Sequence, residues 1–146
     1  MRRLPASRPL LVAVSISLSL LCASCGKKGP PLYPVRGEVF FDGKPAAGAI
    51  VVLHPAGDDA VDAPRPSGQV KEDGSFELDT FPHGKGAPAG DYKVAIVWYD
   101  PKGEVNPQTG EAPSLLPARY ASPATSGLGA HVDAGPTQLK PYQLSR

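Results

Sequence analysis

The clearest structural pattern in the chain is SGQVKEDGSFELDT, residues 67–80. Its centre, Glu72-Asp73-Gly74, is typical of a turn, because Asp tolerates left-handed backbone conformations and Gly adopts them freely. Beyond the turn, Phe76 and Leu78 alternate with acidic residues, which is the period-two pattern of a strand with one buried face. The stretch therefore predicts a β-hairpin formed by residues 67–71 and 75–80.

The same patterns recur on both sides of this hairpin. Alternation predicts a strand over 35–41 that Asp42-Gly43 reverses, and an Ile/Val-rich strand follows over 49–53. The longest expected strand is 91–99, with Trp98 on its core face, and two short strands cover 128–132 and 138–144. No stretch has a helical period. The fold class predicted is all-β, a single antiparallel β-sandwich of seven strands.

One segment does not fit any strand. Residues 100–126 contain five prolines, and irregular segments of this length are uncommon inside a compact domain and are often functional. The five are Pro101, Pro107, Pro113, Pro117 and Pro123. Their presence predicts a long surface loop.

The N-terminus has the features of an export signal. Three arginines and no acid occupy the first eight residues, and residues 10–21 form an uncharged, mainly apolar run. About a dozen residues is too short for a membrane-spanning helix, which needs about 20. Cys25 follows the small pair Ala23-Ser24 and is similar to the cysteine of a bacterial lipobox. In that motif the cysteine receives a diacylglyceryl thioether and begins the mature chain.

The lipobox resemblance is incomplete. Cys22 stands at the third place before the expected cleavage, where the motif prefers Leu or Val, so an ordinary signal peptide cut nearby is the alternative. We expect a signal peptide over 1–24, a lipid anchor with a Pro/Gly tether over 25–34 and a sandwich over 35–146. A lipid anchor at Cys25 implies export and attachment to a cell-envelope membrane, at its periplasmic or outer face.

Composition limits the partners of the mature chain. Removal of 1–24 leaves 122 residues and 12 basic against 14 acidic side chains, a formal charge of −2. This balance gives no reason to expect nucleic acid as a partner. An acylated Cys25 would also leave no thiol for a disulfide, so a hydrophobic core must stabilise the domain.

Several motifs together resemble a known fold family. Gly37-x-Val39-x-x-Asp42-Gly43-x-Pro45, Asp73-Gly74-x-Phe76 and Gly90-x-Tyr92-x-Val94 are similar to the transthyretin-like or carboxypeptidase-regulatory-like β-sandwich. Small exported bacterial lipoproteins that consist of little but this domain resemble the chain further, through Leu116-Pro117-Ala118-Arg119-Tyr120. The resemblance implies location and a binding or structural role more than any biochemistry.

No catalytic or metal-binding residues are expected. The enzymes on related sandwiches require a Tyr-Arg-Gly-Ser C-terminus or a Tyr₂His₂ iron site, and the chain ends Gln143-Leu144-Ser145-Arg146 and lacks a close histidine pair. No Gly-x-Ser-x-Gly elbow is present. Loop acids are expected to be solvated rather than to bind calcium. These acids are Asp58, Asp59 and Asp62, and the three histidines are His54, His83 and His131.

Two functional hypotheses remain, neither of them enzymatic nor dependent on a cofactor. In the first, the sandwich is a structural or protein-interaction module held at the envelope membrane, with an unknown envelope protein as partner. In the second, it binds carbohydrate, and its partner is a polysaccharide. Tyr99 and Tyr120 are the candidate ligand contacts of the second hypothesis, because sugar rings stack on exposed aromatic faces.

Overall fold

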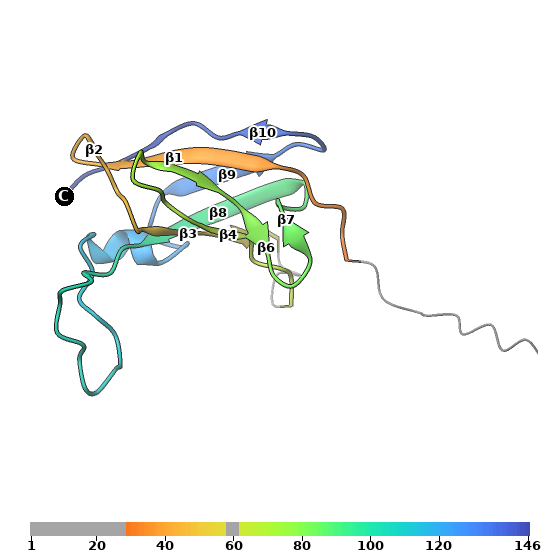
Figure 1. Cartoon of the computed structure of the whole chain (residues 1–146). Helices are drawn as coiled ribbons and strands as arrows, with labels where there is room; N and C mark the ends of the chain where they lie inside the picture. The colour runs from red at the N-terminus through yellow and green to blue at the C-terminus, as the bar shows by residue number, and fades with distance from the viewer. Residues whose placement is uncertain (1–28, 58–61) are drawn as a thin grey trace, which may run out of the picture.

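Two β-sheets pack face to face around one hydrophobic core (Figure 1). This architecture is seen in a computed structural model that describes residues 29–57 and 62–146. The first sheet contains β1 (Val35–Phe41), β2 (Lys44–Pro45), β5 (Ser75–Glu77), β10 (Thr137–Gln138) and β11 (Tyr142–Leu144). The second runs in the order β7 (Gly84–Lys85), β6 (Asp79–Thr80), β4 (Ser67–Gln69), β3 (Ile50–Pro55), β8 (Gly90–Val97) and β9 (Leu128–Val132). The predicted all-β sandwich is confirmed.

The core consists of the alternating apolar residues of the longer strands. Val39 in β1, Leu53 in β3 and Val94 in β8 are fully buried, as period-two alternation requires. Phe76 is the largest fully buried side chain, and its ring stacks on that of Tyr142 at 6.4 Å between centroids. This contact joins β5 to β11 inside the first sheet, so Phe76 has the position of a central core residue.

The expected hairpin of residues 67–80 forms only in part. The turn is present, with the Lys71 amide donating to the Ser75 carbonyl at 2.7 Å. Beyond it, β5 pairs with β1 in the first sheet, and β6 pairs with β4 in the second. The strand predicted over 75–80 is therefore divided at Leu78, where the chain passes from one sheet to the other. Period-two alternation marks a buried face without saying which sheet covers it.

The prediction of a purely antiparallel sandwich is also wrong in one place. β10 and β11 both pair with β1 in parallel, through Val35↔Thr137 and Val39↔Tyr142. They occupy one edge of β1, while β2 and β5 take antiparallel places on it. The strand expected over 138–144 is thus split into two short pieces around Leu139, Lys140 and Pro141. Pro141 has no amide hydrogen to donate to the ladder.

The tether joins the sandwich two residues before β1. Tyr33 and Ala87 exchange two backbone hydrogen bonds of 2.9 Å each, which fixes the incoming chain beside β7. Gly86 makes the approach possible. Its φ is +101°, and a Cβ there would lie 2.3 Å from the Tyr33 carbonyl oxygen. We call this end of the sandwich, with the tether and the β6–β7 turn, the tether end (Figure 1).

The long loop projects from the opposite end. Residues 100–115, which we call the finger, leave the end of β8 and return to η1 (Ala118–Ala121), a short 3₁₀ helix against β8 (Figure 1). The two arms of the finger are bonded to each other, with the Asp100 amide donating to Pro113 and the Asn106 amide to Glu111, both at 2.9 Å. The finger is therefore a structured projection held by its own backbone hydrogen bonds.

Candidate functional site

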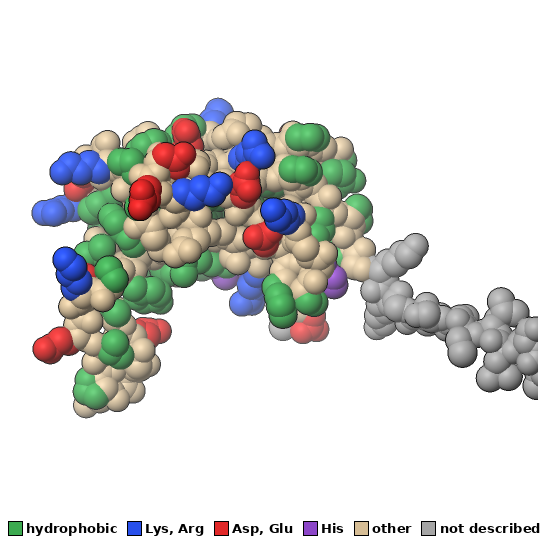
Figure 2. All heavy atoms as spheres, viewed as in Figure 1, with side chains coloured by type: hydrophobic (Ala, Val, Ile, Leu, Met, Phe, Trp, Pro, Cys, Tyr) green, Lys and Arg blue, Asp and Glu red, His purple; other side chains and the backbone are tan. Residues whose placement is uncertain are grey.

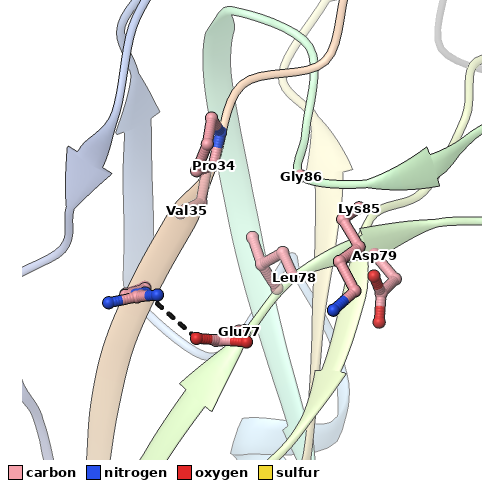
Figure 3. A pocket seen from close by; sticks show the side chains of 8 residues that line it. Pro34, Val35, Glu77, Leu78, Asp79, Lys85 and Gly86 are labelled. Carbon is pink, nitrogen blue, oxygen red and sulfur yellow. Dashed lines mark ion pairs between the residues drawn. The ribbon is translucent and has the colours of Figure 1, made fainter.

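A small hollow lies where the two sheets meet at the tether end (Figure 3). It measures about 230 Å³ and is lined by Pro34, Val35, Arg36, Glu77, Leu78, Asp79, Lys85 and Gly86. Small-molecule sites usually measure about 300–1,000 Å³. Glu77 points toward β1 and pairs with Arg36, Nε to Oε1 at 3.0 Å, while Asp79 and Lys85 lie across from it. The hollow is thus smaller than the usual small-molecule site, and its two acidic and two basic side chains balance in charge.

The most tightly connected titratable cluster is on β8 and β9. His131 approaches Asp91 with Nδ1 at 2.6 Å from Oδ1, and its Nε2 lies 3.4 Å from Asp133 Oδ1. The carboxylates thus bind opposite sides of the ring, so the imidazole lies between them and the three groups do not converge on one point. Among the residues that the structure describes, no three His, Cys, Asp or Glu side chains are arranged to hold a metal ion.

The Asp91 hydrogen bond and charge, aided by Asp133, raise the pKa of His131 above 6.5. Burial, with help from Arg65, lowers the pKa of His54 below 6.5.

We expect NMR titration to find His131 losing its proton at higher pH than His54. The stabilisation that protonated His131 contributes is fully present below the unfolded pKa and is lost as pH rises through its folded pKa. Asp91→Asn should lower the pKa of His131 and leave His54 unchanged; equal shifts at both would contradict this assignment.

The three histidines remain on separate elements. His54 lies in β3 and pairs in register with Lys93, His83 lies in the β6–β7 turn, and His131 lies in β9. Of the three loop acids, Asp58 and Asp59 fall outside the described residues, and Asp62 is exposed. Cys25, the expected lipidation site, also lies outside the described residues.

Tyr120 belongs to the core rather than to an open ligand surface. Its side chain is only 6 % exposed. Its hydroxyl receives hydrogen bonds from Arg119 and from the Ser145 amide, both at 3.1 Å. These bonds lower the pKa of Tyr120 and attach η1 to the C-terminal segment. The ring is thus unavailable for stacking on a sugar, because it is packed inside the protein.

Tyr99 is the exposed member of the predicted pair. It is 41 % exposed and forms a β-bridge with Ser114 at the base of the finger. The sugar platform that needs both Tyr99 and Tyr120 at the surface is therefore not formed. Trp98, expected in the core, lies just past β8 and is half-buried, packing edge-on against Phe41 at 6.2 Å.

Sequence patterns missed two features of the surface. The Asp91–His131 pair was missed because the two residues are 40 positions apart and meet only through β8–β9 register. Phe81 directly follows the strand predicted over 75–80 and was assigned no role, yet it is 93 % exposed. The signal for Phe81 was available: it is a large aromatic residue outside any alternating pattern and is followed directly by Pro82.

Comparisons with known proteins do not assign the chain to a family. No family model matches the sequence, and no curated protein matches it. A DUF3823 family protein from Parabacteroides merdae ATCC 43184 is similar in structure, with 17 % identity and a TM-score of 0.38. The match covers 76 % of this chain and 45 % of that one, so the chain spans less than half of its length. A TM-score of 0.38 does not establish a shared family.

Proposed function

We propose that the protein is an exported lipoprotein, anchored through Cys25 to a cell-envelope membrane, and that its transthyretin-like sandwich is a non-catalytic structural or protein-interaction module. The observation that carries the anchor is in the sequence. A basic start, a short apolar run and two small residues precede Cys25, and a proline-rich stretch follows it. Among the described residues no helix has the length and hydrophobicity to cross a bilayer.

The arrangement of the domain fits such an anchor. The tether enters at one end of the sandwich and the finger projects from the other (Figure 1). A lipid on Cys25 would hold the tether end near the membrane, and the finger would then lie at the far end of the sandwich. The side of the sandwich seen in Figure 2 has acidic and basic side chains interspersed, without a large patch of one sign. Such a face is typical of a solvated surface.

The finger is the best candidate for contact with a partner. It carries exposed Val105 (57 %) and Leu115 (42 %), with Tyr99 at its base. Its acids outnumber its single base: Asp100, Glu104 and Glu111 against Lys102. Apolar side chains on a structured projection suit a protein interface, because its conformation is already fixed before binding.

Site-specific photo-crosslinking in the native envelope tests this role. A photoreactive amino acid at Val105 should give discrete crosslinks to an envelope protein. The matched control is the same substitution at Gln143, an exposed position on β11. Equal crosslinking at both positions, or no protein crosslink at Val105, would contradict the finger as the interaction element. Crosslinks to polysaccharide alone would favour the carbohydrate hypothesis.

A further inference from the structure

The most exposed large apolar side chain of the described residues is at the tip of the β6–β7 turn. Phe81 is 93 % exposed, and Pro82 and His83 beside it are also exposed. Burial of an aromatic ring is favourable in free energy, and an exposed ring gains this stabilisation only when another apolar surface covers it. The turn therefore presents an apolar tip that no other described residue covers.

The tip is held rigidly. The ladder pairs Asp79↔Lys85 and Thr80↔Gly84 close the base of the turn. The His83 amide donates to the Thr80 carbonyl at 2.7 Å, and the buried Thr80 hydroxyl donates to the Gly86 carbonyl at 2.7 Å. Phe81 is thus presented by a structured hairpin rather than by a loose loop.

The tether passes directly beside this turn. Tyr33 is bonded to Ala87, and Gly29 lies against His83, since a Cβ on Gly29 would be 2.6 Å from His83 Nδ1. Cys25 is four residues before Gly29. Four residues of chain reach at most about 14 Å, so any lipid on Cys25 is confined to the vicinity of the turn.

We infer that the β6–β7 turn is a membrane-contacting tip, with Phe81 inserted at the lipid interface beside the acyl anchor. The inference rests on the proposed anchoring at Cys25. The chemistry of the segment suits a lipid surface: residues 80–90 contain no Asp or Glu, and Lys85 lies at the base of the turn, across the ladder from Asp79. Exposed aromatic side chains are a common element of interfacial membrane contacts.

The contact would orient the sandwich. A single lipid attachment restrains the distance of the domain from the bilayer but not its direction, whereas a second contact from the structured turn fixes which end faces the bilayer. The headgroup layer on each side of a bilayer is about 5–7 Å thick, which a projecting aromatic side chain can enter. With the tether end on the membrane, the finger is at the opposite end of the sandwich.

Fluorescence quenching by brominated lipids tests the contact in the full acylated protein. Trp98 is the only tryptophan of the chain and lies at the finger end, so the unsubstituted protein is an internal control. Phe81→Trp adds a reporter at the tip, and Val105→Trp adds one on the finger. In vesicles of phosphatidylcholine with brominated acyl chains, we expect the emission added by Phe81→Trp to be largely lost and that added by Val105→Trp to be unchanged.

The intact mass of the same preparation separates the possible failures. Suppose that the mass shows the acylated chain and that the Phe81→Trp emission is quenched no more than that of Val105→Trp. The inferred membrane contact of the β6–β7 turn is then contradicted, while the proposed acylation is supported. If the chain carries no lipid, the anchor is overturned, and the membrane tip that depends on it falls too.

Discussion

Replacing Phe76 with alanine is expected to unfold a large fraction of the protein. The ring is 1 % exposed and stacks on Tyr142, with the backbone of Gly37 against its edge. Removing a buried phenylalanine costs about 3–5 kcal/mol, because both transfer free energy and packing contacts are lost. A small domain has only about 5–15 kcal/mol in total. Urea denaturation followed by circular dichroism should show the loss as a lower midpoint.

Glu77→Ala is the matched control, one residue along the same strand. Its side chain is 44 % exposed and pairs with Arg36 on the surface. Exposed ion pairs contribute about 0–1 kcal/mol, so this variant should unfold close to the unsubstituted protein. Equal destabilisation by both substitutions would mean that the inward and outward faces of β5 are assigned incorrectly.

Local patterns were sufficient to predict the longer strands and most of their buried faces. Val35, Val39, Phe76 and Val94 are all buried where alternation places them. The turn at Asp42-Gly43 also forms as expected, with positive φ at both residues. These features depend on residues that are close in sequence, so a local sequence pattern is enough to predict them.

The pairing of the strands could not be predicted in the same way. The passage of the chain between sheets at Leu78 depends on the pairing of β5 with β1, between residues about 40 positions apart. The parallel pairing of β11 with β1 joins residues about 100 positions apart. No local pattern specifies such contacts. The same limit applies to the surface, since the Asp91–His131 pair arises from register and the burial of Tyr120 from the fold of η1 against β8.

Cys25→Ser is expected to have the largest effect on location. Serine cannot form the thioether, so the variant should be found as a soluble species that leaves the detergent phase, or as an uncleaved precursor of higher mass. A diacylglyceryl group with an amide-linked chain is enough for stable anchoring, whereas a single chain is marginal. Phase partitioning of the two proteins from the same envelope measures the difference.

The neighbouring cysteine provides the control. Cys22→Ala changes the other thiol of the chain but leaves Cys25 in place, so it should keep the protein in the detergent phase. Release by Cys22→Ala and retention by Cys25→Ser would contradict the assignment of the lipid to Cys25.

The central claim is that Cys25 is the acylated first residue of the mature protein. Mass spectrometry of the N-terminal peptide, from protein purified out of the native envelope, tests it most directly. The account predicts a chain that begins at Cys25 and carries the mass of its acyl groups. A chain that begins downstream of Cys25 with an unmodified N-terminus would contradict it.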